Sequence, residues 1–186
     1  MNMNTDEEIL KAIDSGDRKA MRALYDSYSG YATAVGLRYI PDMYLLKDVL
    51  QDSFIKVFTN IGCFNYRGEG SLKAWITRIV TNEAINFLRE HNRFCFTDEL
   101  PEETPEEETP DIDGISNEKI TELIGRLPDG YRTVLSLYVF EGLSHKEIAN
   151  RLNIKENSSA SQYARAKTML ARMIREMKRK DPTGLP

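Results

Sequence analysis

Apolar residues recur every three or four positions through most of the first 96 residues, and no segment alternates strictly between apolar and polar side chains. Strict alternation is typical of a half-buried strand, whereas spacings of three and four place apolar side chains on one face of a helix. Between Met43 and Ile61, apolar residues at this spacing include Leu46, Leu50, Phe54, Val57, Phe58 and Ile61. The pattern therefore predicts a group of helices in this part of the chain.

A further helix is predicted from Ser71 to about Arg93, after a break at residues 62–70 that contains three glycines. The Ser71 hydroxyl is placed to cap this helix by accepting a hydrogen bond from a first-turn backbone amide. One face of this helix is apolar, and a second face carries an aromatic ring, two amides and three guanidinium groups without an acid: Trp75, Arg78, Asn82, Asn86, Arg89 and Arg93. Single-stranded nucleic acid binds such a mixture through phosphates, stacked bases and unpaired base edges. A solvated basic face is the alternative that the pattern leaves open.

Charge divides the 186 residues into three parts, although the net charge is only -4. Residues 1–96 contain 12 basic and 12 acidic side chains. Residues 97–118 contain no basic and 10 acidic side chains, and residues 119–186 contain 13 basic and 7 acidic ones. The acidic stretch also contains three prolines and no aromatic residue, a composition that cannot form a packed core. We therefore predict an all-α protein with two small helical domains, residues 1–96 and 117–180, joined by an acidic flexible linker at residues 97–116.

The segment after Gly142 is typical of a helix-turn-helix. Ser144 and Glu147 can form a capping box, and Asn153 tolerates the left-handed backbone that the turn requires. A second helix is predicted from about Asn157, with short polar side chains on an exposed first turn and basic residues beside them. The residues expected to contact DNA are Lys155, Ser158, Ser159, Ser161, Gln162, Arg165 and Lys167. A basic helix that docks on an acidic protein is the alternative.

Both parts resemble a known family. DVLQDSFIKVF followed by GEGSLKAWITRIVTNEAINFLRE is similar to region 2 of bacterial sigma factors, and LPDGYRTVLSLYVFEGLSHKEIANRLNIKENSSASQYARAKTML resembles region 4. Both regions in this order, with only a linker between them, indicate the extracytoplasmic-function group. The resemblance covers about residues 5–178. It implies a dissociable subunit that gives bacterial RNA polymerase its promoter specificity.

The resemblance also implies partners and contact residues. Core RNA polymerase would be bound through its β′ clamp helices and its β flap, with Asp48, Gln51, Asp52 and Lys56 on the clamp-binding helix. The −10 element would be melted and read by the loop residues Phe64, Tyr66 and Arg67 together with Trp75, Arg78, Asn82, Asn86 and Arg89. Asn82 and Asn86 would read bases, while Arg78 and Arg89 would hold phosphates. The helix-turn-helix would bind the −35 duplex.

The chain departs from the family at two positions of the predicted recognition helix. Many members carry valine and lysine where this chain has Ser159 and Ala160, so one apolar core contact and one basic DNA contact are missing. An anti-sigma factor is a common further partner in the group, although no segment of this chain identifies one.

Other classes of function have less support. A two-domain regulator that binds duplex DNA without polymerase and a helical adaptor both remain alternatives. No enzyme, metal or cofactor is expected, because His91 and His145 lack metal-ligand spacing, are expected at the surface, and accompany no glycine-rich phosphate loop. The two cysteines, Cys63 and Cys95, indicate a reducing, cytoplasmic location. No apolar run approaches the 18 or so residues of a membrane span, so membrane insertion is not expected.

Overall fold

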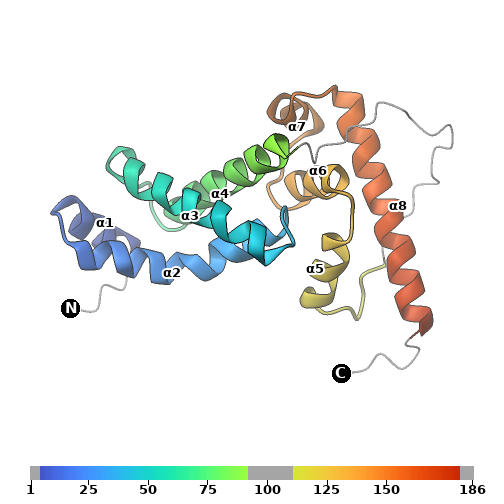
Figure 1. Cartoon of the computed structure of the whole chain (residues 1–186), viewed down its shortest axis with the longest axis horizontal. Coiled ribbons are helices and arrows are strands. Elements are labelled where there is room, and N and C mark those ends of the chain that lie inside the picture. Colours follow the sequence, from blue (N-terminus) through green and yellow to red (C-terminus); the bar gives the residue numbers. More distant parts are fainter. Residues whose placement is uncertain (1–4, 92–110, 181–186) are drawn as a thin grey trace. The chain divides into compact units, whose positions relative to one another are not determined.

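The computed structural model describes residues 5–91 and 111–180. These residues form eight α-helices and one 3₁₀ helix and contain no strand, which confirms the predicted all-α class (Figure 1). The chain divides into two compact units, Met1–Phe87 and Leu88–Pro186. Residues 97–110 of the expected linker, with Arg93 and Cys95, lie outside the described residues.

The first unit contains three α-helices, the 3₁₀ helix and all but the last three residues of a fourth α-helix. They are α1 (Asp6–Asp14), α2 (Arg18–Leu37), α3 (Met43–Asn60), η1 (Ile61–Cys63) and α4 (Ser71–Glu90). The first three helices begin after Thr5, Asp17 and Asp42, whose side-chain oxygens accept from first-turn amides. These caps satisfy amides that have no partner inside the helix, and they explain why each helix starts where it does.

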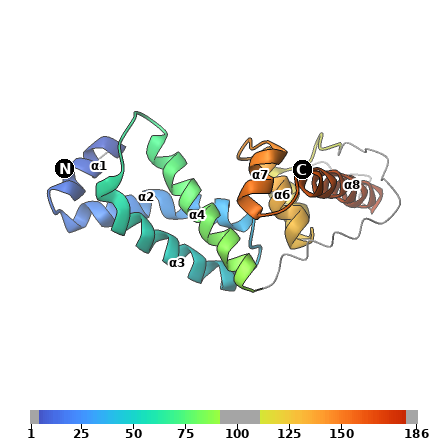
Figure 2. The ribbon, with the colours of Figure 1, turned by 90° about the horizontal axis from the view of Figure 1, so that it is seen from above.

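Helices α2, α3 and α4 lie side by side around one apolar core (Figure 2). Leu24, Leu46 and Ile76 are fully buried there, one from each helix. A Cβ added at Gly36 would overlap the Leu46 side chain, so the close approach of α2 and α3 depends on this glycine. Helix α1 is held onto α2 by the Tyr28 hydroxyl, which donates to the Asp6 carboxylate at 2.7 Å from Oδ1.

The second unit contains α5 (Asn117–Gly125), α6 (Asp129–Val139), α7 (His145–Leu152) and the long α8 (Glu156–Lys180). Helices α5, α6 and α7 all pack against α8 (Figure 1). Their shared core contains Leu123, Leu135, Leu170 and Ile174, and Ile115 packs against it. Lys178 Nζ lies 2.7 Å from Asp111 Oδ2. The last residues of the expected linker therefore pack with this unit.

A buried arginine organises the turn between α5 and α6. The Arg132 side chain is 3% exposed, and its Nη1 donates to the Leu127 carbonyl at 2.6 Å and to the Gly125 carbonyl at 3.3 Å. Its Nη2 pairs with the Asp129 carboxylate. The carboxyl end of a helix leaves carbonyls without partners. Arg132 thus satisfies two such carbonyls, and the Asp129 carboxylate balances its charge.

The helix-turn-helix expectation is confirmed in its local details. Ser144 and Glu147 form the capping box at the start of α7, and hydrogen bonds from Ser144 hold the pKa of Glu147 below its ordinary value. Asn153 ends α7 in the left-handed conformation, at φ 57° and ψ 50°. In the ranges that are described, none of the helices is both long enough and apolar enough to cross a membrane.

Candidate nucleic-acid interface

Helix α4 presents the predicted polar face. Its apolar residues Leu72, Ile76, Val80 and Ala84 are fully buried. They follow one another at intervals of four residues, which keeps them on the side of the helix that meets the core. The other face is therefore outward, with Trp75 half-buried and the rest exposed: Arg78, Asn82, Asn86 and Arg89. These side chains follow one another along the helix, as a single strand of nucleic acid would require.

The loop before α4 is attached to this face by a contact between two aromatic rings. The ring centroids of Phe64 and Trp75 lie 4.9 Å apart. Gly68 and Gly70 have φ values of 105° and 81°, which side chains other than glycine rarely adopt. The Ser71 hydroxyl, expected to cap the helix, accepts from the Arg67 amide at 3.2 Å and donates to the Gly68 carbonyl at 2.6 Å. It thus folds the loop back onto the start of α4.

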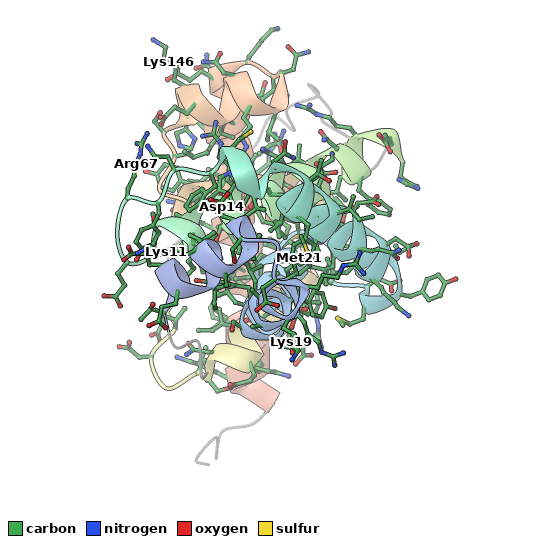
Figure 3. All side chains as sticks on the ribbon, turned by 90° about the vertical axis from the view of Figure 1, so that its left-hand side faces the viewer. Lys11, Asp14, Lys19, Met21, Arg67 and Lys146 are labelled. Atoms are coloured by element: carbon green, nitrogen blue, oxygen red, sulfur yellow. The ribbon has the colours of Figure 1, made fainter. Side chains whose placement is uncertain are left out.

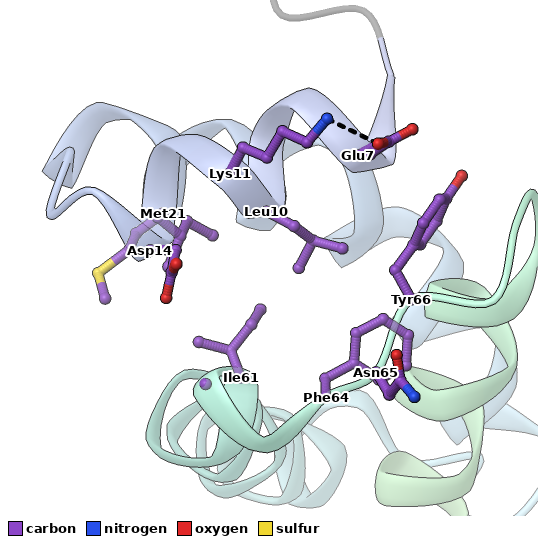
Figure 4. A pocket seen from close by; sticks show the side chains of 11 residues that line it. Glu7, Leu10, Lys11, Asp14, Met21, Ile61, Phe64, Asn65 and Tyr66 are labelled. Carbon is purple, nitrogen blue, oxygen red and sulfur yellow. Dashed lines mark ion pairs between the residues drawn. The ribbon is translucent and has the colours of Figure 1, made fainter.

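A cavity of about 640 Å³ lies between this loop and α1 (Figure 4). Phe64, Asn65 and Tyr66 form the loop side, whereas Glu7, Leu10 and Asp14 are among the residues on the α1 side. Arg67 is exposed and extends from the loop into solvent (Figure 3). The sequence predicted the loop residues but not α1, because α1 lies 50 or more positions before them and no local pattern joins the two.

The outer face of α3 contains the four residues expected to bind polymerase. Asp48, Gln51 and Asp52 are exposed. Lys56 is exposed as well, and its Nζ lies 2.6 Å from Glu83 Oε2 on α4, where the Glu83 side chain is only 13% exposed. Lys56 therefore ties α3 to α4 within the unit, a role that its place in the sequence did not indicate.

Exposed apolar side chains lie beside these polar residues. Tyr44 is 83% exposed, Ile55 54% and Tyr25 47%, and a hollow of about 350 Å³ is lined in part by Tyr25 and Phe58. The sequence pattern did not reveal these exposed apolar residues, because outward apolar residues on a helix fit the same spacing as core residues. Exposed aromatic and aliphatic groups of this kind mark protein-binding surfaces more often than charged groups do.

The first turns of α8 only partly match the expectation. Ser158 and Ser161 are partly exposed, but Ser159 is fully buried and Gln162 is 6% exposed. The expectation that these two face DNA is therefore wrong. The buried positions Ala166, Leu170 and Ile174 are spaced by four, and the same face extended towards the amino end meets Gln162 and then Ser159.

The two buried polar side chains have different surroundings. Ser159 Oγ lies 3.1 Å from His145 Nδ1 at the start of α7. Within the described part of the chain, the buried Oε1 of Gln162 has no hydrogen-bond partner. An unpaired buried amide oxygen is costly. Ser159 and Gln162 thus belong to the interior of the helix-turn-helix.

Aromatic rings surround His145, which is half-buried rather than at the surface. It stacks on Tyr138 with ring centroids 4.8 Å apart and lies 5.7 Å from Tyr163. Lys167 Nζ lies 5.1 Å from the centroid of the Tyr163 ring, and burial raises the pKa of the Tyr163 hydroxyl. Lys155 is exposed and Arg165 is partly exposed, so these cations remain accessible on the outer side of the helix.

Metal binding receives no support from the described ranges, where no group of three or more His, Cys, Asp or Glu side chains could hold an ion.

Two family descriptions match the two units. Residues 24–94 match "Sigma-70 region 2", and residues 117–170 match "Sigma-70, region 4". The chain is 28% identical over 186 residues to the ECF RNA polymerase sigma-E factor of Haemophilus influenzae, covering 93% of this chain and 97% of that protein. It is 26% identical over 192 residues to the RNA polymerase sigma-H factor of Pseudomonas aeruginosa, covering 96% and 98%.

Among solved structures, the chain matches CnrH in complex with the cytosolic domain of CnrY. The TM-score is 0.48 and the sequence identity 21%, with 92% of this chain and 97% of that chain covered.

Proposed function

Because the chain belongs to the extracytoplasmic-function group of the sigma-70 family, we propose that it binds core RNA polymerase and directs promoter-specific transcription initiation. The observation that supports this most is that regions 2 and 4 both match, in this order. The region 2 match lies mostly in the first compact unit, and the region 4 match lies entirely in the second. A regulator with a lone helix-turn-helix would not explain the match of the first unit. This alternative is therefore not favoured.

For the −10 element, we assign the exposed face of α4 and the loop before it. Asn82 and Asn86 read unpaired bases, while Arg78 and Arg89 bind phosphates. Trp75 supports Phe64, since the two ring centroids lie 4.9 Å apart. Extruding a base costs a few kcal/mol, so melting requires new contacts that offset this cost. A helix face with amides, cations and an aromatic wall provides them.

For the −35 element, we assign the outer side of the helix-turn-helix. Duplex DNA needs only groove and phosphate contacts, which the exposed part of α8 can make. The contact residues are Lys155, Ser158, Ser161, Arg165 and Lys167. Ser159 and Gln162 are excluded because they are buried, and their role is to support the recognition helix from inside.

For core polymerase, we assign the outer face of α3 to the β′ clamp helices. Asp48, Gln51 and Asp52 supply its polar contacts, and Ile55 with Tyr25 supplies apolar area beside them. The second unit would bind the β flap. An anti-sigma factor that covers either surface would block polymerase, and a cytoplasmic location follows from the role. We assign the chain no catalytic activity, and we propose residues 1–96 and 117–180 as its two domains. Residues 97–116 join them, and Asp111 and Ile115 of this segment pack with the second domain.

Run-off transcription with purified core polymerase tests the proposal. The chain should convert core enzyme from non-specific to promoter-specific initiation on genomic fragments, and its binding to duplex DNA alone should be weak. An Asp48→Ala, Gln51→Ala, Ile55→Ala variant should lose both core binding and transcription while its helical content is unchanged. Tight sequence-specific binding without core, together with no transcription in its presence, would contradict the proposal.

A further inference from the structure

His145, the first residue of α7, contacts two other helices of the second unit. Its ring stacks on Tyr138 of α6, with the centroids 4.8 Å apart and the ring planes 19° apart. On α8, the Tyr163 ring centroid lies 5.7 Å from that of His145, and Ser159 Oγ lies 3.1 Å from His145 Nδ1. His145 therefore joins the start of α7 to both α6 and α8.

The Ser159 hydroxyl is fully buried, and a buried hydroxyl without a hydrogen bond is unfavourable. Its separation of 3.1 Å from His145 Nδ1 is a hydrogen-bond distance. A neutral imidazole nitrogen accepts a hydrogen bond from a hydroxyl group, whereas a protonated one donates to it. His145 can therefore serve as the partner of Ser159 in either charge state of the ring.

The buried face of α8 is polar at its amino end and apolar further along. Ala166 and Leu170 bury the later turns, whereas Ser159 and Gln162 occupy the same face in the first two turns. Apolar packing is non-directional, but a hydrogen bond depends on angle as well as on distance. The bond between Ser159 and His145 is thus a directional contact that orients the amino end of α8 on α7.

Two of the residues proposed to contact the −35 element lie close to Ser159 on α8. Ser158 and Ser161 are both partly exposed. Successive residues of an α-helix are rotated by about 100°, so the direction in which Ser159 points also fixes the directions of Ser158 and Ser161. A rotation of α8 about its axis would displace both hydroxyl groups from the base edges, and hydrogen bonds weaken steeply when they are misaligned.

We propose that His145 is a positioning residue for promoter recognition. Through Ser159 it sets the rotation of the recognition helix, and it thereby determines which bases of the −35 element Ser158 and Ser161 accept. The inference rests on the proposed function. A phosphate contact carries no sequence information, so an effect of His145 on base preference distinguishes this role from a contact with the DNA backbone.

Two matched substitutions test the role. Leucine and asparagine have similar shapes and both remove the ring that stacks on Tyr138, but only asparagine keeps a hydrogen-bonding group on Cγ, the atom that carries Nδ1 in histidine. Core polymerase with each variant initiates on a barcoded library of promoters randomised at the −35 and −10 elements. His145→Leu should weaken the wild-type base preference about fivefold or more at the −35 element and keep the −10 pattern, whereas His145→Asn should stay within about twofold of the wild type at both.

Base preference is a ratio between templates for the same holoenzyme, so a lower fraction of folded protein does not change it. A role of His145 in stability alone would therefore leave the −35 pattern intact. Lys146→Gln is the control, because Lys146 is the neighbouring residue of α7 and extends into solvent (Figure 3). This variant should keep the base preferences of the wild type at both elements.

Ser159→Ala tests the other partner of the bond. It should change the −35 pattern as His145→Leu does, and the double variant should change it no further, because both substitutions remove the same bond. Circular dichroism verifies folding, and Ser159→Ala, the smaller change, decides the matter if His145→Leu does not fold.

An unchanged −35 pattern in either folded single variant would overturn the inference while leaving the proposed function intact. An equal loss with His145→Asn, or a wild-type chain without any −35 preference, would do the same. Failure of the wild-type chain to initiate specifically would overturn the proposed function instead.

Discussion

Among the described residues, two small hydroxyl side chains are buried in the first unit, whereas five polar or charged side chains are buried in the second. Those in the first unit are Ser53 and Thr81, and those in the second unit are Arg132, Thr133, Ser136, Ser159 and Gln162. Ser53 donates to the Val49 carbonyl of its own helix at 2.7 Å, a bond that lets serine occupy an apolar position. In the first unit polarity is thus a good guide to exposure, and in the second it is not.

The difference has a physical basis in the shape of each interior. The first unit contains three long helices whose apolar stripes cover one another. The second packs three short helices and the turns between them against the long α8. Buried polar side chains there serve the interior, as Arg132 does for two carbonyls at the turn after α5 and Ser159 does for His145. A polar residue in the second unit can therefore serve the interior, and only its contacts tell whether it faces DNA.

The largest effect is expected from Arg132→Ala. It should lower the stability of the second unit by about 3–5 kcal/mol, since it leaves Asp129 and two helix-end carbonyls without their buried partner. Denaturant unfolding followed by far-UV circular dichroism measures the loss. Fluorescence of Trp75, the one tryptophan of the chain, should be unchanged because it reports on the first unit.

The matched control is Arg126→Ala. Arg126 pairs with Glu122 on the surface, so its removal should cost less than about 1 kcal/mol. Equal effects of the two substitutions would mean that burial of Arg132 does not matter.

The next effect concerns the exposed amides of the first unit. The combined Asn82→Ala, Asn86→Ala variant should slow open-complex formation by at least tenfold, because each lost base contact removes roughly 1–3 kcal/mol of recognition. Stability and core binding should be retained, since both side chains are exposed. Permanganate footprinting and native gels measure opening and core binding. Lys19→Ala serves as the control, and a parallel loss of core binding in the double variant would show that the face is misassigned.

Tyr28→Phe tests how α1 is attached. The variant should lose about 1 kcal/mol at neutral pH, because a half-buried hydroxyl bonded to a carboxylate is removed. Burial, and then the bond to Asp6, raises the pKa of Tyr28 above its ordinary value of about 10. The stabilisation is therefore complete below about pH 10 and is lost as the pH rises through the higher folded pKa.

Unfolding monitored by Trp75 fluorescence between pH 7 and 11 checks this sign. The difference between wild type and Tyr28→Phe should shrink in the alkaline range. A difference that stays constant to pH 11 would contradict the assigned bond.

Gln162→Leu should stabilise the second unit by about 1 kcal/mol, because it replaces a buried amide that has an unpaired oxygen within the described residues. Initiation by holoenzyme at a −35-dependent promoter should stay within about twofold. Ser161→Ala, on the partly exposed side of α8, provides the comparison. If Gln162→Leu leaves stability unchanged and impairs initiation instead, its side chain reaches DNA.

The smallest effect is expected from Arg165→Ala. Loss of one phosphate contact should reduce the slope of the logarithm of promoter binding against that of salt concentration by about one unit. A salt titration of holoenzyme on duplex −35 DNA measures it. An identical slope in the variant would remove Arg165 from the interface.

Much of the fold follows from short-range rules. Helical spacing predicted the helices, and the capping box of Ser144 and Glu147 and the left-handed Asn153 were all confirmed. The outward face of α4 was also predictable, since its apolar and polar residues occupy separate stripes. These features depend on neighbours within a few residues, and such neighbours are visible in the sequence itself.

Other features were decided only by tertiary contacts. The first turns of α8 are polar on every side, so their spacing could not show that Ser159 and Gln162 face inward. Lys56 bonds to a partner 27 residues away, and the cavity joins Leu10 to Phe64. In each case the same side chain is compatible with solvent, with the interior or with a ligand, and the energetic choice depends on which distant group the fold brings to it. The sequence determined the helices and their family, and the packing determined which of their polar residues are free to bind.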